Sequence, residues 1–296
     1  MPMSGQGDKT AKKITLVDLP PFPAVAIRAL QLVSKSETRL SELHDLISSD
    51  PAFAAEILRL ANSPLYGIRT VIMSTVQATI LLGFERVKGV ALTIAMRSYI
   101  GKSLQVPVFR ASWRHSLACA MIAEEVGKAM CMDKDAAYTI GLIHDIGRLG
   151  LAVLQPDIYS SILQNVHENS ASVLESEREL FGMDHCHAGH LMATGWHLPD
   201  LFIEVASRHH EVRRSELLDA LAVVRLSCKM ADALGFEFAP CADRPEYDTL
   251  LQELPERARG QMDPHSIDFA TRLEQKIGCV ESAPGNPAAK AEASLA

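Results

Sequence analysis

Residues 141–149 read GLIHDIGRL and end an apolar stretch that is predicted to be helical over 134–147. Helical spacing places His144 on one face with Ala137 and Ile140, so this face is expected to point into the core. Asp145 follows at the predicted end of this helix, so that one helix end can provide both an imidazole and a carboxylate. An isolated buried carboxylate costs several kcal/mol, and a metal ion or a cationic partner offsets that cost. The stretch therefore predicts a core helix that carries a polar centre.

The rest of the chain repeats the same pattern. Apolar residues recur at spacings of three and four almost throughout, whereas alternating runs typical of strands are few and short. The sequence therefore predicts an all-α protein. Helix starts are marked by Asp50 before Pro51, and by Ser74 and Ser172, each with Gln or Glu three residues later. The expected helices lie near 21–33, 40–48, 51–61, 74–83, 85–100, 110–130, 134–147, 156–168, 171–180, 185–194, 200–210, 215–235 and 264–277.

The domain organisation is predicted as a two-lobed helical bundle. The first lobe covers 15–110 and the second 111–240, with a C-terminal helical extension over 241–281. The segments 1–14 and 282–296 contain too little apolar bulk to pack, so both are expected to be disordered tails.

Composition restricts the setting of the protein. The 296 residues are 48% hydrophobic and carry a net charge of -7, without a block of Lys and Arg, which argues against nucleic acid or an anionic membrane as partner. The longest uncharged run, 70–84, is shorter than the roughly 20 residues that span a bilayer. The N-terminus does not resemble a secretory signal, and the six cysteines form no CxxC pair. These features predict a soluble cytoplasmic protein with reduced thiols.

Histidines and aspartates at the inward faces or the ends of five predicted helices form the candidate metal centre. Five such side chains can meet at one point only in a helical bundle. Imidazole and carboxylate ligands suit Fe, Mn, Ni or Zn, and the set could hold one or two ions. Cys119 and Cys228 share faces with these residues and are interpreted as packing residues, with a thiol next to a metal as the alternative. The candidate ligands are His115, His144, Asp145, His185, His209, His210 and Asp232.

These residues resemble a known family. A histidine 29 residues before the His-Asp pair, and an aspartate well after it, resemble the H…HD…D pattern of the HD-domain superfamily of metal-dependent phosphohydrolases. Four further segments look like the HDOD domain, an HD relative found in bacterial signalling proteins. They are LPPFPAVAIRAL (19–30), SDPAFAAEILRLANSPLYG (49–67), ATILLG (78–83) and FGMDHCHAGHLMATGWHLPD (181–200).

The resemblance implies roles for the candidate ligands. His115, His144, Asp145 and Asp232 match the first-metal ligands of the superfamily, whereas His185, His209 and His210 resemble second-metal ligands. Arg148 stands where HD enzymes usually have a lysine. The Gly-Tyr-Pro signature of the HD-GYP enzymes, which hydrolyse cyclic di-GMP, does not follow Glu211.

Two functions follow from this resemblance. The favoured one is a signalling or regulatory module that acts mainly by binding a signalling protein and retains an HD-type metal site. The alternative is a metal-dependent phosphohydrolase or phosphodiesterase that acts on a nucleotide or cyclic dinucleotide. In that alternative Asp145 would bridge two ions, and Arg148 would bind the phosphate. The oligomeric state cannot be read from the sequence.

Overall fold

The computed structural model describes residue 19 and residues 24–34, 39–169, 172–211, 219–238 and 244–282. Within these ranges the chain forms helices and no strand, which confirms the all-α prediction. The tails predicted over 1–14 and 282–296 lie outside the described residues, except for Ser282, which is the C-cap of the last helix. The helices are α1 (Ala24–Ser34), α2 (Leu40–Ser48), α3 (Pro51–Ala61), η1 (Pro64–Tyr66), α4 (Thr75–Leu82), α5 (Phe84–Ile100), η2 (Gly101–Gln105), α6 (Pro107–Ala129), α7 (Lys134–Ile143), α8 (Ile146–Leu154), α9 (Pro156–Asn169), α10 (Val173–Phe181), α11 (His185–Gly195), α12 (Asp200–Arg208), α13 (Ala220–Ala233), α14 (Tyr247–Leu251), α15 (Glu256–Arg259) and α16 (Ser266–Glu281).

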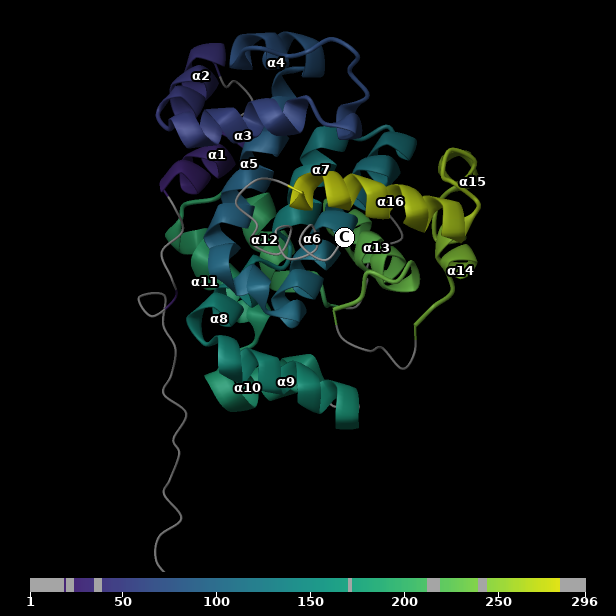
Figure 1. Cartoon of the computed structure of the whole chain (residues 1–296). Helices are drawn as coiled ribbons and strands as arrows, with labels where there is room; N and C mark the ends of the chain where they lie inside the picture. Colours follow the sequence, from purple (N-terminus) through teal and green to yellow (C-terminus); the bar gives the residue numbers. More distant parts are fainter. Residues whose placement is uncertain are drawn as a thin grey trace, which may run out of the picture.

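Helices α1 to α4 gather at one end of the molecule (Figure 1) and pack on each other and on α5. Helix α3 starts as predicted, because the Asp50 carboxylate accepts the backbone N–H groups of Ala52 and Phe53, and Pro51 needs no such acceptor. The Ser74 side chain likewise accepts the Gln77 N–H at the start of α4. Ser172 makes no side-chain cap, so the capping box predicted there is wrong.

Helices α6, α7 and α13 form the middle of the molecule, with α8, α11 and α12 beside them. Helix α5 connects the end formed by α1 to α4 with this middle part, since it packs on α1 and α3 and also on α7. Buried apolar residues of all these helices belong to one continuous core. Helix α6 begins at Pro107, a few residues before the start predicted at residue 110.

The helix predicted over 134–147 is divided, which corrects the prediction of one continuous helix. Helix α7 ends at Ile143 and α8 begins at Ile146. The His144 ring donates from Nδ1 to the carbonyl of Gly141, the acceptor that a continuous helix would use for the backbone N–H of Asp145. The His-Asp pair therefore lies in a turn at the helix junction.

Two glycines allow the helices at this junction to pack closely on neighbouring helices. A side chain at Gly147 would overlap the backbone of α11 at His185 and Gly189. A side chain at Gly141 would approach the backbone of Ala120 on α6 to 2.8 Å. Both glycines therefore allow backbone contact where α8 crosses α11 and where α7 crosses α6. The stretch Lys134–Leu154 is long and apolar enough to cross a membrane, but nearly all of it is buried inside the protein, as in the core helix of a globular domain.

Candidate metal centre

His115 lies on α6 and is buried. Its Nδ1 is 3.0 Å from the carbonyl oxygen of Phe236 and 3.3 Å from Oδ1 of Asp232. A carbonyl can only accept, so the proton of the ring is held at Nδ1 and Nε2 faces the interior. This Nε2 lies 3.4 Å from Sγ of Cys119, one helical turn further along α6.

His144 is fixed in the same way. Its Nδ1–H donates to the Gly141 carbonyl at 2.7 Å, which leaves Nε2 at 3.6 Å from Oδ2 of Asp145. The rings of His115 and His144 are 5.6 Å apart. The two histidines therefore present Nε2 atoms to a common space, each oriented by an oxygen acceptor behind it, as metal-binding histidines are.

His185, at the start of α11, is held by Glu177 of α10. The Glu177 carboxylate accepts Nδ1–H of the ring at 2.7 Å and the backbone N–H of His185 at 2.8 Å. Tyr159 donates its hydroxyl to the other oxygen of this carboxylate at 2.6 Å. Burial raises the pKa of Glu177, but His185 and the other donors outweigh burial and lower it below its usual range. Nε2 of His185 therefore also faces inward.

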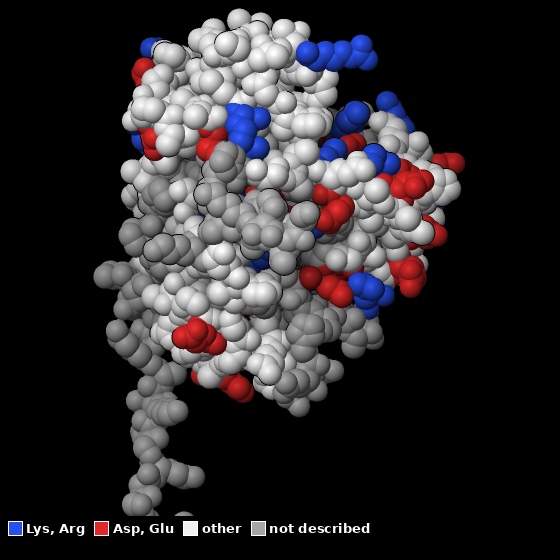
Figure 2. All heavy atoms as spheres, viewed as in Figure 1, with Lys and Arg blue, Asp and Glu red and all other residues white. Residues whose placement is uncertain are grey.

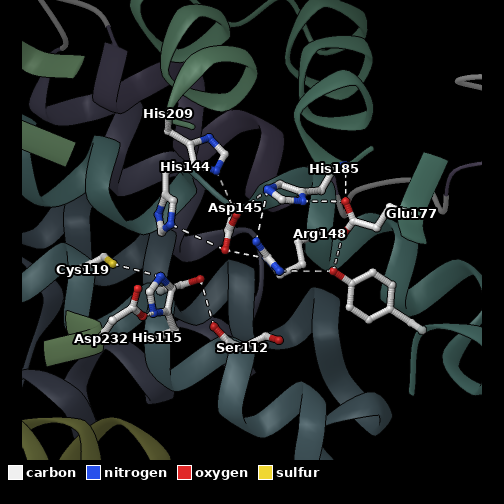
Figure 3. A network of polar contacts seen from close by, with 12 residues as sticks. Ser112, His115, Cys119, His144, Asp145, Arg148, Glu177, His185, His209 and Asp232 are labelled. Carbon is white, nitrogen blue, oxygen red and sulfur yellow. Dashed lines mark hydrogen bonds and ion pairs between the residues drawn. The ribbon is translucent and has the colours of Figure 1, made fainter. Parts of the chain in front are cut away.

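Arg148 holds a fixed positive charge beside these groups (Figure 3). Its Nε donates to Oδ2 of Asp145 at 2.7 Å, and its Nη2 lies 3.2 Å from Nε2 of His185. The guanidinium also stacks on Phe238, with 3.6 Å between its carbon and the ring centre, and Arg148 is only 1% exposed. Nε2 of His185 thus accepts from an arginine in this arrangement.

Asp145 lies between Arg148 and three histidines (Figure 3). Its Oδ1 is 3.2 Å from Nε2 of His209 and 3.5 Å from Nε2 of His185. Burial raises the pKa of Asp145, but Arg148 and the imidazoles lower it well below its usual range. The Asp145 carboxylate is therefore ionised at neutral pH.

His209 and Asp145 face each other with two hydrogen-bond acceptors. Its Nδ1–H donates to the Val205 carbonyl at 3.1 Å, which leaves Nε2 as an acceptor that faces the Asp145 carboxylate. Oδ1 of Asp145 and Nε2 of His209 are both buried without a hydrogen-bond partner. Burial lowers the pKa of His209 below its usual range, although the Asp145 carboxylate that faces the ring acts to raise it. Two facing acceptors of this kind fit a cation.

The structure brings the candidate ligands together in two groups. In the described part of the chain, His115 and His144 meet Cys119 and Cys228, with one ligand atom from each residue within 4.8 Å of every other. The second group meets the same criterion and contains Asp145, His185, His209 and His210, of which His210 is exposed and the others are buried. The carboxylate and imidazole donors of the second group fit metal ions of the kinds predicted, Fe, Mn, Ni or Zn.

Asp232 lies outside both groups. Its side chain is 30% exposed and contacts Nδ1 of His115, on the side of the ring that faces away from the other ligands. Cys228, one turn earlier on α13, takes the inward position instead. Asp232 can therefore orient His115, whereas the first-metal ligand set suggested by the resemblance is not assembled as expected.

Sequence reasoning placed Cys119 and Cys228 on the faces of the candidate ligands, because they lie four positions from His115 and Asp232, and interpreted them as packing residues, with a thiol next to a metal as the alternative. It missed one residue of this centre, Glu177. Glu177 could not be found this way, because it reaches His185 across the turn between α10 and α11.

The thiols of Cys119 and Cys228 shift each other's pKa. A hydrogen bond from Cys119, together with the nearby histidines, holds the pKa of Cys228 well below its usual range in spite of burial. Burial and the Cys228 charge raise the pKa of Cys119 well above its usual range.

A surface hollow of about 450 Å³ leads to the second group. Its lining includes Arg178, Asp184, His187, His190 and His210. Because His210 belongs to both the hollow and the second group, that group is the one closer to solvent.

The fold and the histidine–aspartate centre define an all-helical protein of the HD type. Residues 19–212 match the HDOD domain, and the chain belongs to this family. It is similar to an HDOD domain protein of unknown function from Geobacter sulfurreducens, with a TM-score of 0.71 and 24% identity over 89% of this chain and 93% of that chain.

Two other solved structures share the fold. A protein from Shewanella amazonensis SB2B, described as a proposed phosphohydrolase, has a TM-score of 0.66 and 20% identity over 90% of this chain and 95% of its own. A proposed signal transduction protein from Marinobacter aquaeolei VT8 has a TM-score of 0.66 and 22% identity over 91% of this chain and 61% of its own. Identities this low show the fold alone.

An uncharacterized protein from Treponema pallidum (strain Nichols) is 19% identical over 227 residues, which are 73% of this chain and 43% of that protein. The chain therefore spans less than half the length of this relative.

Proposed function

We propose that the chain is a cytoplasmic bacterial signal-transduction module that acts mainly by binding a signalling protein. In this proposal it binds neither nucleic acid nor a membrane. One observation carries the proposal, an exposed apolar surface on and before α4, which we call the α4 patch. It consists of Val71, Met73, Val76, Ile80 and Leu81.

The α4 patch is unusual for a surface helix. Met73 is 78% exposed and Ile80 is 75% exposed, and of the residues of α4 only Ala78 is buried. A contiguous group of exposed large apolar side chains commonly marks a surface that another protein covers. Figure 2 shows the end of the molecule where α4 lies as largely uncharged, whereas basic and acidic side chains are interspersed elsewhere on this face. An apolar partner surface would remove this patch from water.

The polar centre supports a regulatory function more than turnover. Arg148 pairs with Asp145 and donates to His185, so the groups that would hold a second ion are already neutralised by a side chain. An ion bound by His185 together with Asp145 would require the guanidinium to move away from Nε2 of His185. We infer that the centre mainly ties α6, α7, α8, α11 and α12 together.

A metal-dependent phosphohydrolase is the second candidate. The unpaired Asp145 Oδ1 and His209 Nε2 favour it, as does the hollow at His210, which could admit a nucleotide phosphate. An ion held by Asp145, His209 and His210 would supply a hydroxide at neutral pH. The guanidinium of Arg148 would then have to turn from Asp145 to the phosphate.

The interaction is tested by photo-crosslinking in the host bacterium. A photoreactive amino acid replaces Ile80 of the α4 patch or, as control, Ile267 of α16, which is 79% exposed. We expect a discrete adduct with another protein at position 80, its loss when Met73→Asp is added, and no such adduct at position 267. Equal labelling at both positions, or no adduct at position 80, would contradict the proposed interaction.

The alternative is tested by phosphoesterase assays with cyclic dinucleotides, nucleoside phosphates and a generic phosphodiester, each with added Mn or Fe. We expect no turnover by the wild type above that of Asp145→Ala. Metal-dependent hydrolysis that disappears in Asp145→Ala would establish the enzyme.

A further inference from the structure

We propose that His115, Cys119, His144 and Cys228 form a closed four-ligand site for Zn²⁺, separate from the Asp145 group. The inference is independent of the α4 interaction and of phosphoester hydrolysis.

The donor set is the first argument. Two sulfur and two imidazole nitrogen ligands form a combination that selects zinc, whereas carboxylate and imidazole sets accept a wider range of metals. Two thiolates would also neutralise the charge of the ion within the core. The Asp145 group offers no sulfur ligand, so the two groups differ in the ions that they prefer.

The geometry is the second argument. Bonds of zinc to sulfur and nitrogen place tetrahedral ligand atoms roughly 3.3–3.8 Å apart. The distance of 3.4 Å between Sγ of Cys119 and Nε2 of His115 falls in this range, and all four ligand atoms lie within 4.8 Å of one another. His115 and Cys119 occupy successive turns of α6, so a regular helix already provides half of the site.

The orientation of the rings is the third argument. Nδ1 of His115 is held by the Phe236 carbonyl and Asp232, and Nδ1 of His144 is held by the Gly141 carbonyl. Both rings therefore present Nε2 to the two sulfur atoms. Supporting contacts of this kind accompany histidine ligands of zinc.

Burial shows which kind of zinc site this would be. His115, Cys119 and His144 are buried, and Cys228 is only partly exposed. With four protein ligands the site leaves no open position for water, which is typical of structural zinc rather than catalytic zinc. The ion would join α6 to α13 and to the junction between α7 and α8.

The proposal is tested on protein purified without an affinity tag. Elemental analysis should find about one zinc per chain, and exchange for Co²⁺ should produce the near-ultraviolet absorption of thiolate-bound cobalt and the visible bands of a tetrahedral ion. Cys119→Ser and Cys228→Ser should each lose the thiolate absorption in part and weaken metal binding at least ~100-fold. Cys279→Ser, which changes a half-buried thiol on α16, should leave both unchanged.

Asp145→Asn separates the two groups. We expect this variant to keep the cobalt absorption, whatever its effect on hydrolysis or partner binding. A cobalt spectrum without thiolate absorption, or metal binding that survives both cysteine changes but not Asp145→Asn, would overturn the proposal. A Cys119–Cys228 disulfide in fresh protein, seen as a mass loss of two hydrogens, would also overturn it. If the cysteine variants fail to fold, the wild-type spectrum decides.

Discussion

Arg148 is the residue on which the interpretation of the polar centre depends most. Its guanidinium is the cation closest to Asp145, and Phe238 covers the face of the group. In the phosphohydrolase alternative Arg148 would bind a phosphate, whereas in the structure it is paired with Asp145. The helical spacing of three between Asp145 and Arg148 could have indicated this pair.

Replacing Arg148 should therefore be costly. Arg148→Met keeps most of the volume but leaves the Asp145 carboxylate buried without its cation, so we expect a loss of about 3–5 kcal/mol in the free energy of unfolding measured with urea. Arg272→Met, which breaks the exposed pair with Asp263, is the control and should change stability little. A similarly small change for Arg148→Met would show that Asp145 is not dependent on this partner.

Glu177 gives a prediction with a pH dependence. Its folded pKa lies below the ordinary 4.5, so its contribution to stability is fully present above pH 4.5 and is lost as the pH falls below that value. Glu177→Gln weakens charged hydrogen bonds to His185 and Tyr159 and should cost about 1.5–3 kcal/mol at pH 7, with a smaller difference from wild type at pH 4. Urea unfolding at both pH values measures this.

The control for Glu177 is Glu179→Gln, an exposed change on the same helix, which should stay within about 0.5 kcal/mol of wild type at both pH values. A Glu177→Gln effect that is equal at pH 4 and pH 7 would mean that the charge of this carboxylate is not what stabilises His185.

Among the secondary-structure elements, the junction between α7 and α8 shows where sequence reasoning stopped. The apolar spacing identifies the helices correctly, because core packing follows the helical period. It predicts one helix through His144, since the spacing carries no information about a ring that takes over the Gly141 carbonyl. Likewise, Ser172 has the right residue type for a cap, but its side chain accepts no backbone N–H.

The crossing of α8 and α11 supports a prediction about packing. Gly147→Ala would force the backbones of the two helices apart at His185, so we expect a loss of about 3 kcal/mol or more in the free energy of unfolding. Gly278→Ala on α16, where the added methyl group meets nothing within 4 Å, should instead stabilise the protein by about 0.5–1 kcal/mol. A neutral Gly147→Ala variant would contradict this close approach.

At the scale of the whole molecule, the sequence predicted the class of fold and most of the residues of the centre. Helical spacing predicted inward positions for His115, His144 and Asp232; the two histidines are buried, whereas the side chain of Asp232 is 30% exposed. The division of the ligands into two groups could not be predicted, because it depends on how α6 and α13 pack around the α7–α8 junction.

The α4 patch is also a feature that can be recognised only in the whole folded molecule. The sequence shows a long uncharged run over 70–84, which alone does not distinguish a core segment from a surface. Only the packing of α4 on α2, α3 and α5 shows that one side is covered and that the α4 patch remains exposed. The proposal of partner binding therefore rests on tertiary structure.

The most direct test of the central claim is a crystal structure of untagged protein with anomalous diffraction measured on both sides of the zinc absorption edge. We predict one zinc peak among His115, Cys119, His144 and Cys228, with Arg148 still paired to Asp145. Two metal peaks bridged by Asp145, with the guanidinium of Arg148 turned away, would contradict the account and would indicate a hydrolytic centre.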